Sequence, residues 1–245
     1  MPDATANVRR LSGRIPAIIP VRRGSVELPN KNMRPINGVP LLTYTITAAK
    51  QSGAVSRVIV STDDEAAASL ARSEGVEAIF HPSELSADDA PTVGVIVWNY
   101  RRLATEGAVE TLLVLRATSP LRTSADIDNA VNLISRNPDA DSLVSVVANP
   151  GMHPIRMKRV LPDGMVVDAF EAEGYSPRRR QTLEQLYLRN GAIYIATARV
   201  LDDGRMWGEH CLAYVMPQER SVNINTAFDF EVAELFISRQ HPAKP

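Results

Sequence analysis

Short apolar runs alternate with amphipathic stretches over residues 15–147 of the chain. Apolar runs of strand length lie at residues 15–21, 57–61, 76–80, 111–117 and 142–147. Between them, apolar residues spaced three and four apart predict helices at residues 40–53, 64–74, 91–106 and 123–136. Strands that are apolar throughout are typical of a sheet covered on both faces. The pattern therefore predicts an α/β fold with a mostly parallel sheet and helices on both faces.

The alternation stops at residues 149–188, which are rich in Pro, Gly, Met and Arg and match neither the strand nor the helix period. It resumes with predicted strands at 191–197 and 211–216 and a last helix at about 226–239. We therefore expect a flexible leader at 1–14 and a single domain at 15–245. The insertion at about 149–188 would cover a ligand crevice or meet a second subunit.

Composition narrows the range of partners and compartments. The formal net charge is −1, so the overall balance favours neither nucleic acid nor an anionic membrane as a partner. The sequence contains no apolar stretch of membrane-spanning length. The single cysteine, Cys211, excludes an intrachain disulfide, suits a reducing compartment and is expected in a buried strand. These features predict a soluble, cytoplasmic protein without membrane or nucleic-acid partners.

The predicted sheet places one ligand crevice beyond the carboxyl ends of its parallel strands. The loops after Val21, Ser61, Phe80 and Ala117 should meet there. The first of these loops lies within residues 20–32 and combines basic residues with glycine. That composition is typical of a loop that holds a nucleoside triphosphate.

Several short blocks, taken in order, resemble the acylneuraminate cytidylyltransferase family, the CMP-sialic acid synthetases and their relatives for bacterial nonulosonic acids. The blocks are PVRRGSVELPNKN (20–32), VSTDD (60–64), ELSADDAPT (84–92), ATSPLRT (117–123), RRQTLEQLYLRNGAIYI (179–195) and RSVNINTAFDFEVAE (220–234). The resemblance implies a Rossmann-like nucleotidyltransferase fold with a dimerisation insertion, and hence a homodimer. It also implies transfer of CMP from CTP to a nonulosonic (sialic-acid-like) sugar acid, with release of pyrophosphate.

The resemblance assigns the basic loop to the nucleotide. Arg22 and Lys31 would be the catalytic cations that bind the triphosphate, and Gly24 would allow its close approach. The other expected nucleotide contacts are Ser25, Asn32, His81 and Thr92. A surface loop with solvated charges is the alternative for residues 20–32, and Thr92 either contacts the nucleotide or caps a helix.

A second group of residues matches the part of the family pattern that surrounds the sugar acid. Arg122 is a candidate partner for its carboxylate, because a guanidinium can bind a carboxylate at two points. The other expected substrate contacts are Arg116, Ser119, Arg179, Gln181 and Asn190. The alternatives are a helix flank for Arg122 and a solvated charge run at residues 178–180.

The chain departs from the family pattern at positions that the family uses for phosphate, nucleotide and metal. Val26 stands where the family has lysine, His81 where it has arginine, and Arg116 where it has glutamine. Asn223 and Asn225 replace the two carboxylates that the family uses for Mg²⁺. An amide oxygen can ligate Mg²⁺ but brings no negative charge.

These departures leave the metal and the activity open. The resemblance implies Mg²⁺ as the cofactor, with Asn223, Asn225 and Asp229 as its possible ligands, although Asp229 also fits a first-turn acid of a helix. Asp63 and Asp64 are further acids at the ligand edge. Two alternatives to a cytidylyltransferase remain: a nucleotide- or sugar-binding homologue with lost or weak catalysis, and a nucleotidyltransferase for a different acidic substrate.

Overall fold

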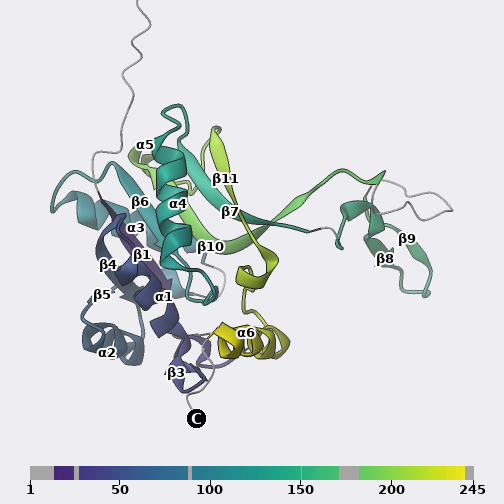
Figure 1. Cartoon of the computed structure of the whole chain (residues 1–245), viewed down its shortest axis with the longest axis horizontal. Helices are drawn as coiled ribbons and strands as arrows, with labels where there is room; N and C mark the ends of the chain where they lie inside the picture. The colour runs from purple at the N-terminus through teal and green to yellow at the C-terminus, as the bar shows by residue number, and fades with distance from the viewer. Residues whose placement is uncertain (1–13, 25–27, 88–89, 150, 171–181, 241–245) are drawn as a thin grey trace, which may run out of the picture.

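A seven-stranded mixed sheet forms the centre of the computed structural model (Figure 1). The structure describes residues 14–24, 28–87, 90–149, 151–170 and 182–240. The strand order is β11-β7-β10-β6-β1-β4-β5. Its strands are β1 (Ile15–Val21), β4 (Val55–Thr62), β5 (Glu77–Phe80), β6 (Thr111–Leu115), β7 (Ser142–Ala148), β10 (Tyr187–Thr197) and β11 (Cys211–Met216). The strands predicted from the sequence are all present.

Neighbouring strands are parallel except around β10, which runs antiparallel to both β6 and β7. The prediction of a mostly parallel sheet is confirmed, and β10 is the exception within it. Cys211 lies in a strand as expected, at the start of the edge strand β11, but it is half-buried rather than buried. An edge strand has a neighbour on only one side, which leaves its side chains more exposed.

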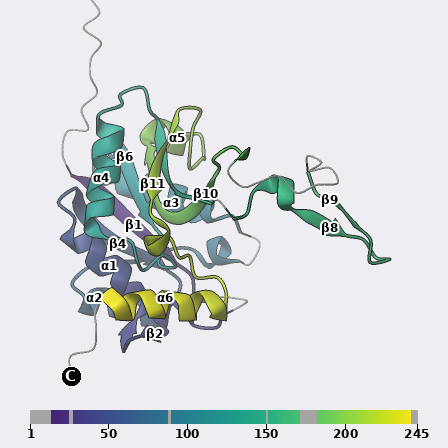
Figure 2. The same ribbon diagram turned by 45° about the vertical axis from the view of Figure 1, so that its right-hand side comes forward.

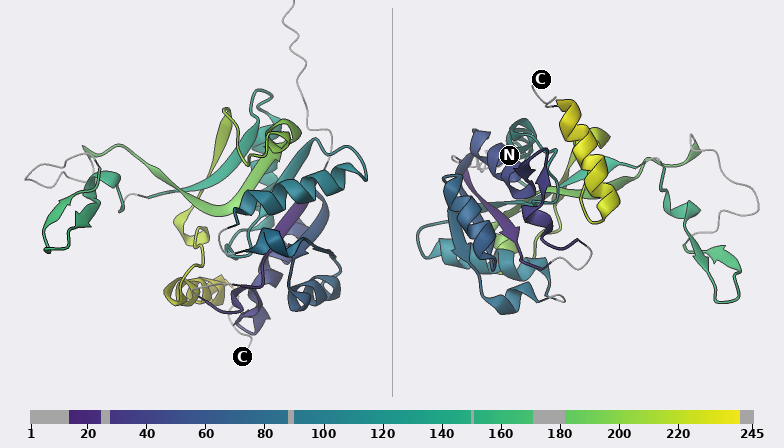
Figure 3. Two further views of the ribbon diagram at one scale, coloured as in Figure 1. Left: turned by 180° about the vertical axis from the view of Figure 1, so that it is seen from behind. Right: turned by 90° about the horizontal axis from the view of Figure 1, so that it is seen from below.

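Helices cover both faces of the sheet, as predicted (Figure 3). The helices are α1 (Leu41–Gln51), α2 (Glu65–Ser73), α3 (Thr92–Ala104), α4 (Ser124–Ser135), α5 (Ala198–Asp202) and α6 (Ala227–Gln240). Buried side chains of α1, α2 and α4 share one apolar cluster with the sheet, and those of α3 and α5 share the cluster on the opposite face. None of the described helices is long and apolar enough to cross a membrane.

Helix α6 packs at the ligand end of the sheet. A third apolar cluster joins Phe230 and Ile237 of α6 to Leu41 of α1 and to Leu121, which follows β6. Ile224, just before α6, is fully buried in the same cluster. Beside it, the small hairpin of β2 (Pro35–Ile36) and β3 (Val39–Pro40) contributes Ile36. This cluster holds the C-terminal segment against the ends of β1 and β6.

The segment between β7 and β10 extends away from the sheet (Figures 1 and 2). It carries an antiparallel hairpin of β8 (Lys158–Val160) and β9 (Val166–Asp168). The expected boundary at residue 188 lies slightly too late, because β10 already begins at Tyr187, which is paired with Ala148. Several apolar side chains of this segment are exposed, among them Val160, Met165 and Phe170.

Candidate functional site

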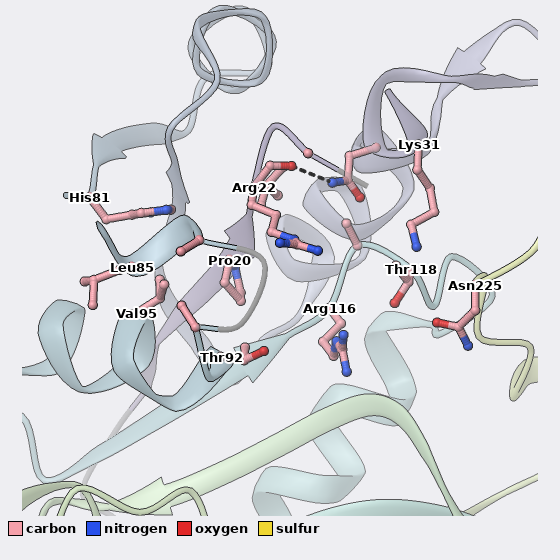
Figure 4. Close-up of a pocket in the computed structure, with 16 residues that line it drawn as sticks. Pro20, Arg22, Lys31, His81, Leu85, Thr92, Val95, Arg116, Thr118 and Asn225 are labelled. Carbon is pink, nitrogen blue, oxygen red and sulfur yellow. Dashed lines mark hydrogen bonds between the residues drawn. The ribbon is translucent and has the colours of Figure 1, made fainter. Parts of the chain in front are cut away.

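A cavity of about 500 Å³ opens at the carboxyl ends of β1, β5 and β6 (Figure 4). Its described lining is Pro20, Val21, Arg22, Gly24, Lys31, Asn32, His81, Leu85, Ala87, Ala90, Thr92, Val95, Arg116, Ala117, Thr118 and Asn225. The predicted meeting of the loops after Val21, Phe80 and Ala117 is confirmed. The loop after Ser61 does not line the cavity but supports it through Asp63, whose Oδ1 accepts the Arg23 backbone N–H at 2.7 Å.

The loop after β1 brings two cations to this cavity. The Asn32 side chain donates to the Arg22 carbonyl oxygen at 3.4 Å, so it braces the loop between Arg22 and Lys31 (Figure 4). A Cβ added at Gly24 would meet no described atom within 4 Å, so packing does not require glycine there. The space above Gly24 is open to a ligand. Ser25 and Val26 lie outside the described residues.

Lys31 also contacts the segment just before α6. Its Nζ donates to the Ile224 carbonyl oxygen at 3.1 Å, and the Ile224 N–H donates to the Thr118 carbonyl oxygen at 2.8 Å. These two contacts fix the segment between the β1 and β6 loops. Asn225 consequently lines the cavity, whereas the Asn223 side chain lies against Gly191 and its buried Oδ1 has no hydrogen-bond partner.

Asp229 acts as a helix cap in this structure. Its Oδ2 accepts the backbone N–H groups of Asn225 at 2.9 Å and Thr226 at 2.8 Å, and the Thr226 hydroxyl at 3.0 Å. Thr226 Oγ1 in turn accepts the Asp229 N–H, which completes a capping box. Burial alone would raise the pKa of Asp229, but these hydrogen bonds hold it below its usual value. The geometry favours the first-turn interpretation over a metal ligand.

The donor set at residues 223–229 does not fit a Mg²⁺ site. Among the described residues, no three His, Cys, Asp or Glu side chains are grouped closely enough to hold a metal ion. Asn223 offers one neutral oxygen that is sealed from the cavity, and Asn225 offers a neutral amide. Mg²⁺ prefers several oxygen ligands that include carboxylates.

His81 borders the cavity but is almost fully buried. Its Nδ1 lies 2.9 Å from Ser61 Oγ and its Nε2 lies 2.7 Å from Ser86 Oγ. Burial lowers the pKa of His81, and the nearby Asp63 carboxylate only partly opposes this shift. A neutral, doubly hydrogen-bonded imidazole therefore stands where the family pattern has an arginine.

Thr92 begins α3 and its side chain is exposed at the cavity. The N-cap residue is Pro91, which has no side-chain hydrogen bond to the helix. Thr92 is therefore not the cap residue, and its expected contact with the nucleotide remains a prediction.

A second cavity of about 450 Å³ adjoins the first, and Arg116 and Thr92 line both. Its lining is Pro91, Thr92, Val93, Ile96, Val114, Arg116, Arg189, Tyr194, Gly204, Arg205, Met206 and Trp207. The Arg189 guanidinium lies over the Trp207 ring, 5.0 Å from its centroid. Sequence reasoning missed Arg189, Tyr194, Arg205 and Trp207. The first two belong to the RNGAIYI block, so that block was the available signal.

Three of the expected substrate contacts line neither cavity. Ser119, Arg122 and Asn190 are buried, and Ser119 Oγ donates to the Asn190 carbonyl oxygen at 3.4 Å. The Asn190 side chain accepts from Ser145 Oγ at 2.6 Å and donates to Ser221 Oγ at 2.9 Å. Both ends of this amide are thus used inside the protein, which favours a structural role.

Arg122 is 2% exposed, and its Nη1 donates to the carbonyl oxygens of Arg116 at 3.3 Å and Ala192 at 3.0 Å. Burial lowers the pKa of Arg122 to about 10, although the Asp126 carboxylate favours its charged form. Because Arg122 lies behind the β6 loop, its position favours a role in holding Arg116 rather than the predicted contact with the substrate carboxylate. Arg179 and Gln181 lie outside the described residues.

Comparisons with known proteins agree with this architecture. Over residues 16–202 the chain matches the family model described as "Cytidylyltransferase". The N-acylneuraminate cytidylyltransferase of Escherichia coli O18:K1:H7 is 36% identical over 90% of this chain, which spans only 51% of that relative. The pseudaminic acid cytidylyltransferase of Campylobacter jejuni is 29% identical over 91% of this chain and 96% of its own length.

Solved structures share the fold at low sequence identity. A CMP:2-keto-3-deoxy-manno-octonic acid synthetase in complex with CTP superposes with a TM-score of 0.69 at 16% identity, covering 93% of this chain and 100% of that chain. A 4-diphosphocytidyl-2C-methyl-D-erythritol synthase gives 0.64 at 12% identity, with 92% and 99% covered. The nucleotidyltransferase fold is therefore shown. Because the family model matches most of the chain, this protein belongs to the cytidylyltransferase family.

Proposed function

We propose that this chain transfers CMP from CTP to a nonulosonic, sialic-acid-like sugar acid and releases pyrophosphate. The observation that carries the proposal is the cavity beyond β1 and β6, which Arg22, Lys31 and Arg116 all line (Figure 4). A triphosphate needs such positive charge, and the exposed β1 loop can add backbone N–H donors. Family membership supplies the reaction class.

In this reaction an acceptor hydroxyl oxygen attacks the α-phosphorus of CTP in line with the leaving group. The bond from that phosphorus to the bridging oxygen breaks, pyrophosphate departs, and the hydroxyl proton passes to water. The chain's task is to position both reactants and to offset phosphate charge. Arg22 and Lys31 would hold the phosphates, and Arg116 would lie between the phosphates and the acceptor.

The second cavity suits the acceptor. It adjoins the nucleotide cavity at Arg116 and Thr92, which would bring an acceptor hydroxyl next to the α-phosphate. Arg116, Arg189 and Arg205 can attract a carboxylate, while Trp207 provides a flat apolar wall for a sugar ring. This arrangement supports a sugar acid as the second substrate.

The segment between β7 and β10 supports a homodimer. Val160, Met165 and Phe170 are 73%, 63% and 67% exposed, so this projecting segment offers apolar surface that a second copy would bury. We therefore propose a single domain from residue 15 onward whose insertion mediates dimerisation. A single half-buried cysteine also supports a reducing, cytoplasmic compartment.

Specific observations favour two alternatives. The neutral Asn223 and Asn225, which replace the family's carboxylates, favour a nucleotide- or sugar-binding homologue with weak or lost catalysis. The Arg116 side chain at the junction of the two cavities favours a nucleotidyltransferase for a different acidic substrate. In either case the nucleotide cavity would be retained.

Pyrophosphate release distinguishes these functions. The purified chain is incubated with each of the four common ribonucleoside triphosphates and a panel of 2-keto sugar acids, with Mg²⁺, with Mn²⁺ and with neither. The proposal predicts release that requires CTP together with a nonulosonate. Binding of CTP without release for any acceptor would support the binding homologue, and release with another acid only would support the changed substrate.

A further inference from the structure

We infer that the nucleotide cavity binds its triphosphate without requiring a divalent metal ion, because cationic side chains offset the phosphate charge. The inference rests on the proposed function and concerns the charge balance of the same cavity. Arg22, Lys31 and Arg116 line it, and none of its described lining residues is an Asp or a Glu.

The segment that should hold a metal ion is docked at the cavity but lacks ligand charge. Ile224 is fixed on both sides, by the Lys31 ammonium at 3.1 Å and the Thr118 carbonyl at 2.8 Å. This docking places Asn225 in the lining with an amide where the family pattern has a carboxylate. Asn223 adds a single buried oxygen next to Gly191 and is not part of the described lining.

Two of the described acids on the segments around the cavity have other roles. Asp63 holds the Arg23 backbone N–H at 2.7 Å, and Asp229 accepts the three cap hydrogen bonds that begin α6. Neither is part of the lining. Asp88 and Asp89 lie outside the described residues, so the experiment tests them directly.

The charge balance sets the expected order of affinities. A dication bound to the triphosphate cancels two of its negative charges. A cavity lined by carboxylates needs that cancellation, whereas a cavity lined by cations loses attraction when it occurs. The metal-free nucleotide should therefore bind this chain at least as tightly as the Mg²⁺ complex.

The test is calorimetric titration of the full chain with CTP, in EDTA and in excess Mg²⁺ at matched pH and ionic strength. For the parent we expect a Kd in EDTA that is equal to or below that in Mg²⁺. Asn225→Asp places a carboxylate beside the phosphates, so its Kd in EDTA should rise roughly tenfold and be restored by Mg²⁺. Asn225→Ser changes the same side chain without adding charge, so the ratio of its Kd in EDTA to its Kd in Mg²⁺ should stay that of the parent.

Each outcome decides the inference. Binding of the parent in Mg²⁺ alone would overturn it, while absence of binding in both buffers would overturn the proposed function as well. Equal behaviour of Asn225→Asp and the parent would show that residue 225 does not face the phosphates, which also overturns it. If the parent depends on Mg²⁺ and Asp88→Asn with Asp89→Asn removes that dependence, the metal site lies at those acids instead.

Discussion

Replacement of Lys31 by alanine removes one of the cations that face the proposed triphosphate. The Lys31 ammonium also donates to the Ile224 carbonyl oxygen at 3.1 Å, so the change acts on affinity and on packing. A charge-assisted contact with phosphate contributes about 1.5–3 kcal/mol, so CTP affinity should fall at least about tenfold. Loss of the half-buried bond to Ile224 should lower the free energy of unfolding by about 1 kcal/mol.

Calorimetric titration with CTP and urea denaturation separate these two effects. Lys50→Ala is the matched control, because the Lys50 ammonium likewise donates to a backbone carbonyl, that of Glu74, but lies outside the nucleotide cavity. The control should lose less stability, because its hydrogen bond is exposed, and should keep the affinity of the parent. If Lys31→Ala binds CTP as tightly as the parent does, Lys31 does not hold the triphosphate and the assignment of the β1 loop is wrong.

Further predictions concern stability, assembly and metal binding. Burial alone would raise the pKa of Asp126, but hydrogen bonds from Arg220 and from the helix-cap residue Thr123 lower it. The contribution of the Asp126 carboxylate to folding stability should therefore persist above about pH 4 and disappear in stronger acid. Asp126→Asn should cost on the order of 3 kcal/mol in urea denaturation, and a loss below 1 kcal/mol would contradict this. Val160→Glu with Val166→Glu should turn a dimeric mass in light scattering into a monomeric one, and a monomeric parent would refute the dimer. Asn223→Asp with Asn225→Asp should strengthen Mn²⁺ binding in the CTP complex and raise turnover with an accepted sugar. If the parent already shows robust Mg²⁺-dependent transfer and the double variant does not improve it, these two asparagines are not a metal-site deficit.

The sheet could be predicted because its strands are buried on both faces. Residues 15–21 are apolar throughout and residues 142–147 are mostly apolar, and each range coincides with a strand to within one residue. The direction of β10 could not be predicted, because an apolar run has the same pattern in either direction. The hairpin of β8 and β9 was missed for another reason: each strand has three residues, too few to show a period.

The nucleotide cavity was more predictable than the acceptor cavity. Arg22 and Lys31 were expected from their place in the loop after the first strand, and Thr92 from its place near a helix start; the fold brings them together. Arg122 and Asn190 were expected at the acceptor because they occur in family motifs. A motif identifies a residue that matters without saying whether its side chain faces a ligand or braces a loop.

Arg116 shows how these two kinds of residue depend on each other. Its side chain lines both cavities, while its carbonyl oxygen accepts hydrogen bonds from buried Arg122 at 3.3 Å and from Thr45 at 3.4 Å. Contacts at the backbone restrict where the exposed guanidinium can reach. The buried Arg122 would therefore influence catalysis without touching a substrate, because it fixes the only charged side chain shared by the described linings of the two cavities.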